Sequence, residues 1–298
     1  MSIYDEIAAK SRVPYAKMSA ALLSTFRGGG VLEHVFAPRN MQEAERLLAV
    51  FQSAGETPIL LGGGSNVLIA DGEVKTPVML TRFLNKIRIA NGYAFCECGA
   101  KVSAISRLAR EYNLGGLEFL TGVPLTIGGA VKMNASAFGR QIFDFVEGVF
   151  IFSRACGVQE CEYAHICEIK RANIDFGYRK GVDGIVLGAK LKLERVDKSA
   201  SLKRAREYLS IRRAKQPIEP SLGSVFKNGD IPAGKLIEEC GLKGKQIGGA
   251  KISEKHANII VNTGGATASE YLALVRLCEI EVKTKFNIQL EREFKLIK

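Results

Sequence analysis

Three consecutive glycines between two apolar runs are the feature that most restricts how this chain can fold. Gly62-Gly63-Gly64 is followed by Ser65-Asn66, with apolar residues at 59–61 before it and at 67–69 after it. Short apolar runs bounded by turn residues predict a strand, a tight turn and a second strand. Because glycine has no Cβ, backbone N–H groups in this turn can approach an anion, but the same residues also suit a hairpin-like turn that binds nothing.

The turn fits neither of the two common glycine-rich nucleotide motifs. A dinucleotide fingerprint requires Gly or Ala where Val67 stands, and a P-loop requires Lys where Ser65 stands. On this stretch alone, the anion-binding turn and the ligand-free turn are equally compatible with the sequence.

A second glycine-rich run favours the ligand-binding interpretation. Residues 115–139 include six glycines, and the run is apolar and almost uncharged between Glu118 and Arg140. A solvated surface loop of this length would be polar, and the small residues recur too irregularly for one helix or one strand. We therefore expect this backbone to lie against a flat ligand.

Periodicity and capping residues predict an α+β fold. Asn40 and Glu43 form a capping box before a helix over residues 41–53, which leads into a strand over residues 58–61. Further helices are predicted over residues 101–112, 198–216, 233–240 and from a cap at Thr267 to about Lys285. Strict apolar alternation from Ile185 to Leu193 predicts a long half-buried strand. A last strand is predicted with one apolar face, formed by Phe286, Ile288, Leu290, Phe294 and Leu296.

Composition and charge narrow the class of protein. A chain of 298 residues with 47% hydrophobic and 24% charged residues is globular and long enough for two domains. It has no apolar segment approaching the roughly 20 residues of a membrane helix and no signal-peptide pattern, so we expect a cytoplasmic protein with no membrane partner. The net charge of +11 is spread along the chain, which favours small phosphorylated ligands over nucleic acid.

The cysteines are predicted to be reduced thiols, and no metal site is expected. Their number is odd, no C-x-x-C pair occurs, and only three histidines could help to bind a metal. They stand at Cys96, Cys98, Cys156, Cys161, Cys167, Cys240 and Cys278.

Several segments between about Phe26 and Glu293 together carry a family resemblance. They are Gly62 to Asn66, Thr121 to Ala135, FGYRKG at 176–181, PSLGSVFKNG at 220–229, AGKLIEECGLKGKQIGGAKISEKHANIIVN at 233–262 and LERE at 290–293. In number and order these motifs resemble those of the UDP-N-acetylenolpyruvoylglucosamine reductases, a family of bacterial cell-wall enzymes. About 40 residues separate Arg179 from Pro220, so the chain resembles the shorter second type, which lacks a tyrosine-bearing segment over the substrate.

The resemblance implies an FAD-binding domain of the vanillyl-alcohol-oxidase (PCMH) type, built from two subdomains, and a C-terminal α+β substrate-binding domain. Its implied activity is the NADPH-dependent reduction of UDP-N-acetylglucosamine enolpyruvate to UDP-N-acetylmuramate by a monomer, with FAD as cofactor and NADPH as co-substrate. We expect a helical lead-in at 1–20, the FAD domain at 21–195 with subdomains of about 21–75 and 76–195, and the substrate domain at 196–298, whose final strand returns Glu293 to the active site.

The chemistry of this reduction assigns roles to residues of the motifs. Hydride addition at C3 leaves electron density at C2 that must be stabilised and then protonated. By resemblance, Ser224 is the proton donor to C2, Arg179 is an electrostatic partner of the substrate carboxylate, and Glu293 is an acid hydrogen-bonded to that carboxylate. His256 is left out of the catalytic set, because a histidine beside a strand is more often structural.

The resemblance also predicts ligand contacts. The FAD diphosphate is expected over Gly62, Gly63, Gly64, Ser65 and Asn66, and the isoalloxazine along Gly122, Val123, Pro124, Gly128, Gly129, Asn134 and Ala135. Candidates for substrate binding are Arg213, Lys227, Asn228, Lys251 and Lys255.

Four residues depart from the family pattern. Leu125 and Ser136 stand where glycine is usual, Gly181 where serine is usual, and Arg292 where proline is common. If position 125 requires a positive φ, its leucine is strained and FAD binds more weakly.

Two other functions stay open on the sequence. A flavin oxidase of the same fold, acting on a small alcohol or hydroxy acid, would share the FAD residues but has no need for the Ser224 and Glu293 motifs. A non-catalytic binder of nucleotide sugars or nucleic acid would be colourless and would not take up FAD.

Overall fold

The structure, a computed structural model, describes residues 2–153 and 166–298. The chain divides into two compact units, each assembled from three separate stretches of sequence. The first unit comprises residues 1–16, 35–63 and 77–210, and the second comprises residues 17–34, 64–76 and 211–298. Within the described ranges, no helix is both long enough and apolar enough to cross a membrane.

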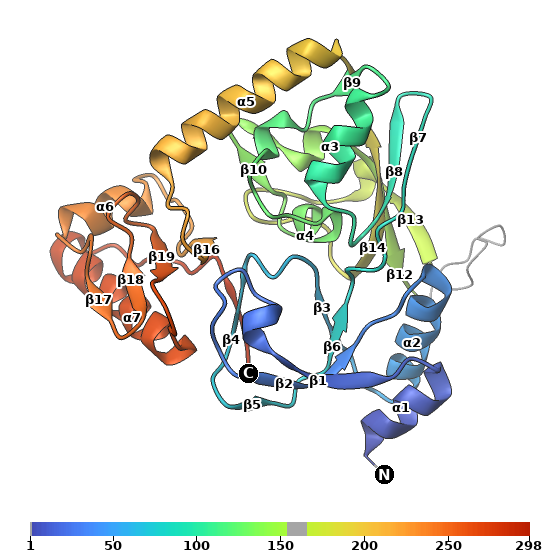
Figure 1. Ribbon diagram of the computed structural model, residues 1–298, viewed down its shortest axis with the longest axis horizontal. Helices are drawn as coiled ribbons and strands as arrows, with labels where there is room; N and C mark the ends of the chain where they lie inside the picture. Colours follow the sequence, from blue (N-terminus) through green and yellow to red (C-terminus); the bar gives the residue numbers. More distant parts are fainter. Residues whose placement is uncertain (1, 154–165) are drawn as a thin grey trace. The chain divides into compact units, whose positions relative to one another are not determined.

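A five-stranded antiparallel sheet forms the centre of the first unit, with α3 (Val102–Arg110) and α4 (Ile127–Lys132) against it (Figure 1). Its order is β13 (Ile166–Lys170), β12 (Val146–Phe152), β14 (Ile185–Lys192), β8 (Tyr93–Glu97) and β7 (Ile87–Ala90). Consecutive residues Val186 and Leu187 of β14 are both buried, in different apolar clusters. The expectation of a half-buried strand is therefore wrong, because this central strand is covered on both faces.

A parallel sheet and two helices complete the first unit. In β2 (Val31–Phe36), Val35 pairs with Val78 of β6 (Val78–Leu80), and β6 pairs in parallel with β3 (Ile59–Leu61). Parallel strands require a crossover connection, which α2 (Met41–Ser53) supplies between β2 and β3. Asn40 Oδ1 accepts a hydrogen bond from Glu43 N at 2.9 Å, which confirms the predicted helix start, and α1 (Ile3–Ser11) packs on α2.

Short elements connect the rest of the first unit. The two-stranded pairs are β9 (Leu114–Gly115) with β15 (Glu194–Arg195), and β10 (Ser136–Ala137) with β11 (Arg140–Gln141). The long helix α5 (Lys198–Lys215) begins against this unit, where Ser201 Oγ donates to Glu118 at 2.5 Å. Gly116 N donates to the other carboxylate oxygen of Glu118 at 2.8 Å, so this buried acid is held from two sides.

The second unit is a small antiparallel sheet packed against two helices (Figure 1). The sheet order is β16 (Ser221–Ser224), β19 (Ile259–Asn262), β18 (Ala250–Ile252) and β17 (Gln246–Ile247), and the helices are α6 (Ala233–Glu239) and α7 (Ala268–Phe286). Buried Tyr271 on α7 packs edge-on against Phe26 and Phe294, with ring centroids 5.0 and 5.3 Å away.

The start of α7 is fixed both locally and from a distant segment. The predicted capping box is present, since Thr267 and Glu270 bond to each other's backbone N–H groups. In addition, the carboxylate of Asp71 accepts hydrogen bonds from the backbone N–H groups of Ala268 and Ser269, each at 2.8 Å.

The strands on either side of the glycine turn pair with different partners. β3 pairs with β6, whereas β4 (Val67–Ile69) pairs in parallel with β20 (Lys295–Ile297). The hairpin-like interpretation is therefore wrong, because turn residues alone do not decide whether the flanking strands pair with each other. The last strand is also shorter than predicted, because among the described residues only 295–297 (β20) form a strand there. Leu290 and Phe294 are nevertheless buried, as predicted.

Four of the cysteines are free thiols, at positions 96, 98, 240 and 278. Burial raises the pKa of the Cys96 thiol to about 12, so this side chain stays protonated and unreactive. Cys167 is disulfide-bonded, so the prediction of seven reduced thiols is wrong at that residue. Sequence spacing alone does not determine which cysteines come within bonding distance. Cys156 and Cys161 lie outside the described residues.

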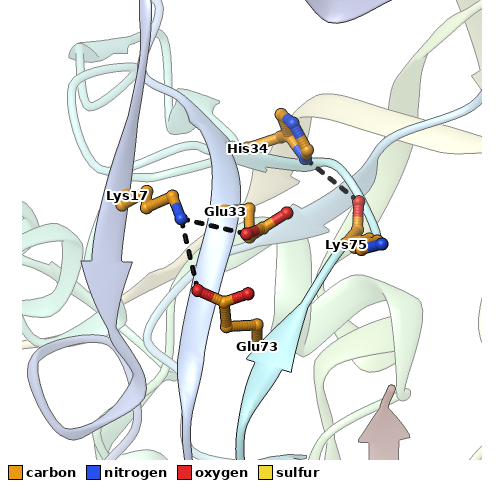
Figure 2. Close-up of polar contacts among 5 residues, drawn as sticks. All are labelled: Lys17, Glu33, His34, Glu73 and Lys75. Carbon is orange, nitrogen blue, oxygen red and sulfur yellow. Dashed lines mark hydrogen bonds and ion pairs between the residues drawn. The ribbon is translucent and has the colours of Figure 1, made fainter.

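A group of charged side chains lies within residues 17–34 and 64–76 of the second unit, on β1 (Tyr15–Ser19), β2 and β5 (Glu73–Val74); β1 and β2 also extend into the first unit. Lys17 Nζ is 3.0 Å from Glu33 Oε1 and 3.4 Å from Glu73 Oε1, and His34 Nδ1 is 3.2 Å from the carbonyl oxygen of Lys75 (Figure 2). The hydrogen bond that Lys17 donates to Glu33 is the main reason that the pKa of Lys17 is raised. Exposed ion pairs of this kind contribute little to stability, so we interpret the group as a solvated sheet edge.

Candidate functional site

The first part of the glycine turn packs directly against the second glycine-rich run. A Cβ on Gly62 would lie 2.2 Å from Thr126 Oγ1, and a Cβ on Gly63 would lie 2.5 Å from the carbonyl oxygen of Pro124. At Gly63 protein backbone therefore already requires glycine, independently of any ligand, whereas at Gly62 the nearest atom belongs to the side chain of Thr126. Gly64 is required for two reasons, since its φ is 62° and a Cβ would lie 1.9 Å from the carbonyl oxygen of Leu23.

Gly129 has no comparable requirement inside the protein. It lies within α4, it is exposed, and a Cβ added to it would come no closer than 3.6 Å to Thr126 Oγ1. Glycine inside a helix costs about 0.5–1 kcal/mol relative to alanine. An exposed helical glycine that the protein itself does not need fits a surface reserved for a ligand. Gly122, seven residues before Gly129, is also exposed and has a φ of 85°, so it too presents backbone that no side chain covers.

Asn134 has an unused acceptor in the interior. Its side chain is 1% exposed, and Nδ2 donates to Gln141 Oε1 at 2.7 Å and to the carbonyl oxygen of Gly177 at 2.9 Å. Oδ1 is buried and has no hydrogen-bond partner among the described residues. Buried polar atoms normally have partners, so a ligand that donates a hydrogen bond would fit here. The exposed glycines and this acceptor together suit the predicted FAD contacts along residues 122–135.

Two departures from the family pattern are compatible with the fold. The backbone of Leu125 is not in the positive-φ region, and its side chain packs against the core of the first unit. The strain expected at this residue is therefore absent. At Gly181, a Cβ would lie 1.8 Å from the carbonyl oxygen of Val131, so serine does not fit this backbone as it stands.

Backbone pairing in the second unit brings together the two segments that contain Ser224 and Glu293. Glu293 N donates to the carbonyl oxygen of Val225 at 2.8 Å, so the glutamate lies opposite the residue that follows Ser224. Lys227 N donates to the carbonyl oxygen of Glu291 at 2.8 Å and extends the pairing by one step. Ser224 and Glu293 are both half-buried, and the Oε2 atom of Glu293 is shielded from solvent.

The pairing also explains why arginine is tolerated at position 292. Arg292 lies opposite Phe226 at a position whose backbone N–H takes no part in the ladder, so proline and arginine are both compatible with it. The arginine side chain forms a two-point ion pair with Glu279 on α7, with N–O distances of 2.6 and 2.8 Å.

Two asparagines hold the backbone on either side of this pair. Asn66 Nδ2 donates to the carbonyl oxygen of Glu293 at 3.2 Å, so a residue predicted to contact FAD also fixes the glutamate backbone. Asn258 is 2% exposed and brackets Phe226, accepting from its N–H at 2.9 Å and donating to its carbonyl at 2.8 Å. The sequence interpretation missed Asn258, although a polar residue within the apolar run 257–261 was a usable signal.

Arg179 belongs to the first unit, at the tip of a two-residue hairpin. Gly177 and Lys180 exchange backbone hydrogen bonds of 2.8 and 3.1 Å, and Arg179 has a φ of 56°. Its Nη1 donates to Ser136 Oγ at 2.9 Å. Ser224 and Glu293 belong to the second unit.

The predicted substrate-binding residues have protein partners. Lys255 Nζ donates to the main-chain carbonyl oxygen of Arg213 at 2.8 Å, so the ammonium group lies beside the Arg213 backbone. Lys251 pairs with Glu254 at 2.5 Å and lowers the pKa of that carboxylate. Lys227 pairs with Glu291, and Asn228 Oδ1 accepts from Ala233 N at 3.1 Å. An anionic ligand would compete with the two glutamates for these lysines.

His256 behaves as a structural residue. Its Nδ1 accepts a hydrogen bond from Asn258 N at 3.2 Å. Burial is the largest influence on its pKa and lowers it, which keeps the ring neutral at pH 7.

Comparisons with known proteins agree over nearly the whole chain. Residues 215–297 match the family model of the UDP-N-acetylenolpyruvoylglucosamine reductase C-terminal domain, and residues 32–161 match that of an FAD binding domain. UDP-N-acetylenolpyruvoylglucosamine reductase of Chloroherpeton thalassium is 38% identical over 297 residues, covering 94% of this chain and 93% of the relative. The Listeria innocua reductase is 35% identical, with coverages of 99% and 96%. The crystal structure of UDP-N-acetylenolpyruvylglucosamine reductase from Thermus caldophilus matches with a TM-score of 0.79 at 32% identity, covering 96% of this chain and 100% of that one.

Proposed function

This chain belongs to the UDP-N-acetylenolpyruvoylglucosamine reductase family, and from that premise we propose that it reduces UDP-N-acetylglucosamine enolpyruvate to UDP-N-acetylmuramate with NADPH as reductant. The predicted fold class is confirmed, since an FAD-binding domain is followed by the C-terminal domain of this family. We place the reaction in the synthesis of peptidoglycan precursors in the bacterial cytoplasm.

The described residues suit FAD as the cofactor. The exposed glycines at 122 and 129 and the Oδ1 atom of Asn134 offer backbone surface and an acceptor to it. When bound and reduced, FAD supplies the hydride that adds to C3 of the enolpyruvyl group. The residues of the chain have to bind the substrate carboxylate, stabilise the charge that develops on it and deliver a proton to C2.

Arg179 and Glu293 stabilise the developing enolate. The guanidinium of Arg179 carries a fixed positive charge with several N–H donors, which suits a carboxylate that gains electron density. Glu293, in its protonated form, donates a hydrogen bond to the same oxygens.

Ser224 completes the reaction by transferring its hydroxyl proton to C2. The Oγ–H bond breaks as the C2–H bond forms, and solvent later restores the proton to the serine. A hydroxyl is a weak acid, so this step requires a fixed position on the reacting carbon. Asn258 supports that requirement, because its two hydrogen bonds to Phe226 immobilise the backbone two residues after Ser224.

The observation that carries the proposal is the backbone hydrogen bond from Glu293 to Val225, at 2.8 Å. It joins the two motifs that the reductases need and a flavin oxidase does not. Residues this distant in sequence come together only through the tertiary fold, and both are of the type that the protonation requires.

Separate measurement of the two half-reactions tests the assignment. We expect Ser224→Ala to be reduced by NADPH at nearly the wild-type rate, because the flavin contacts are unchanged. Reoxidation by UDP-N-acetylglucosamine enolpyruvate should fall by at least about a hundredfold, the usual contribution of a positioned proton donor. Stopped-flow absorbance of the flavin under anaerobic conditions follows both steps.

Ser221→Ala in the same strand is the matched control, and both of its half-reactions should stay near the wild-type rate. Equal damage to both half-reactions in Ser224→Ala would contradict the role of Ser224. A wild-type protein that is bleached by NADPH but not reoxidised by this substrate would contradict the proposed function.

A further inference from the structure

We propose that Ser136 is a positioning residue, which holds the guanidinium of Arg179 in the orientation that receives the substrate carboxylate. The inference rests on the proposed function and adds a residue that neither the family resemblance nor the proposed mechanism assigns. It starts from the hydrogen bond of 2.9 Å between Arg179 Nη1 and Ser136 Oγ.

The backbone at Arg179 is in a conformation that arginine rarely adopts. With φ of 56°, Arg179 occupies the second central position of the Gly177–Lys180 hairpin, where glycine or asparagine is normally preferred. Non-glycine residues in the left-handed region gather at functional sites, where the surrounding structure maintains them. The hairpin therefore fixes the direction of the Arg179 side chain while keeping its backbone in an unfavourable conformation.

Two contacts restrict the flexible part of the side chain. The guanidinium carbon lies 4.9 Å from the ring centroid of Tyr178, and Nη1 is bonded to Ser136. A guanidinium has five N–H donors in a planar fork, so one bond to serine leaves enough donors for a two-point contact with a carboxylate. Loss of the serine hydroxyl would remove the fixed partner of Nη1 and so loosen the orientation of the guanidinium.

Ser136 is itself well placed to act as a fixed point. It lies in β10, opposite Gln141 of β11. Asn134 Nδ2 bonds both Gln141 and the carbonyl oxygen of Gly177, which ties this hairpin to the one that carries Arg179. At the other end, Gly181 N donates to the carbonyl oxygen of Lys132 at 3.2 Å. The distance between the serine and the arginine backbone is therefore set by the fold.

The proposal predicts a loss that depends on the ligand carboxylate. Ser136→Ala should weaken binding of UDP-N-acetylglucosamine enolpyruvate about tenfold, in the range typical of a hydrogen bond to a charged group. Binding of UDP-N-acetylglucosamine, which has no carboxylate, should change less than about twofold. A defect that is merely structural would weaken both ligands alike and would lower the melting temperature.

The chain offers a matched control of the same chemistry. Arg110 Nη1 donates to Ser106 Oγ at 3.0 Å, within α3 of the same unit, so Ser106→Ala breaks an equivalent bond outside the proposed site. Calorimetric titration of both ligands into wild type, Ser136→Ala, Ser136→Thr and Ser106→Ala measures the affinity ratio. Ser136→Thr keeps the hydroxyl and should keep the wild-type ratio, as should Ser106→Ala.

A double variant tests whether Ser136 affects binding only through Arg179. In an Arg179→Ala background, adding Ser136→Ala should produce no further loss of affinity for the enolpyruvyl ligand, because the serine acts only through the arginine. If the affinity ratio of Ser136→Ala equals that of wild type, or if the two losses add, the inference is wrong and the proposed function stands. If the wild type itself binds both ligands equally, the proposed function fails and this inference fails with it.

Discussion

We expect alanine substitutions at Gly63 and Gly129 to have opposite effects on apoprotein stability. Packing inside the protein requires glycine at position 63 but not at position 129. In Gly63→Ala the new methyl group would lie 2.5 Å from the carbonyl oxygen of Pro124, about 0.9 Å short of ordinary contact at 3.4 Å. Backbone cannot rotate away as a flexible side chain can, so the two segments have to separate. In Gly129→Ala the nearest atom, Thr126 Oγ1, is 3.6 Å away and nothing has to move.

These distances set the size of the two effects. Overpacking of a rigid interior costs about 1–3 kcal/mol, and a domain of this size loses about 2–4 °C of melting temperature per kcal/mol. We therefore expect the Gly63→Ala apoprotein to melt roughly 2–12 °C below wild type. Gly129→Ala gains about 0.5–1 kcal/mol of helix stability, so its apoprotein should melt at or slightly above the wild-type temperature.

Affinity for FAD should instead be affected mainly by Gly129→Ala. If Gly129 is reserved for the cofactor, its methyl group obstructs the ligand rather than the protein and weakens the Kd by roughly 5- to 150-fold, equivalent to about 1–3 kcal/mol. Melting of the apoproteins and titration of flavin fluorescence measure the two quantities separately. A Gly63→Ala apoprotein as stable as wild type would refute the clash argument, and a Gly129→Ala protein with unchanged FAD affinity would refute the ligand surface at α4.

Two further predictions concern buried or capping carboxylates. Asp71→Ala removes the distant cap of α7 and should cost about 1 kcal/mol at pH 7 in urea unfolding. Burial opposes ionisation of Asp71, but hydrogen bonds from Ser269 and Ala268 outweigh it and lower its pKa, so the advantage of wild type over the variant should be complete above about pH 4 and disappear as the pH falls through the folded value. A difference that is constant from pH 7 to pH 3 would contradict this. Ser201→Ala removes a hydroxyl donor from buried Glu118 and should lower the free energy of unfolding by about 1–3 kcal/mol, and an unchanged urea midpoint would show that Gly116 N alone is sufficient.

The helices could be predicted closely because their signals are local. Residues 41–53 form α2 with the predicted bounds, and α7 starts directly after the predicted Thr267 cap. A cap and its partner lie three residues apart, so the sequence contains both halves of the interaction. The basic helix α5 and the short helix α6 were also predicted to within one residue at each end.

The partners of strands and side chains could not be predicted in the same way. The glycine turn suggests a hairpin, but β4 pairs instead with β20, which no local pattern indicates. The bond between Ser136 and Arg179 joins residues 43 positions apart, and in the sequence Ser136 is visible only as a departure from the family glycine. Asn258 stands within an apolar run, and its role depends on the backbone of Phe226, 32 positions away. Such contacts depend on tertiary register, which residue types alone do not determine.

The pairing of β4 with β20 has a consequence for how the polypeptide is made. Residues 17–34 and 64–76 leave the ribosome early, yet the apolar side chains of Phe26 and Leu68 are buried by residues that come after position 210. Translation at about 5–20 residues per second leaves them waiting for on the order of tens of seconds. Until residue 297 has emerged, β4 lacks its partner strand, and its unpaired backbone groups are open to pairing with another chain during synthesis.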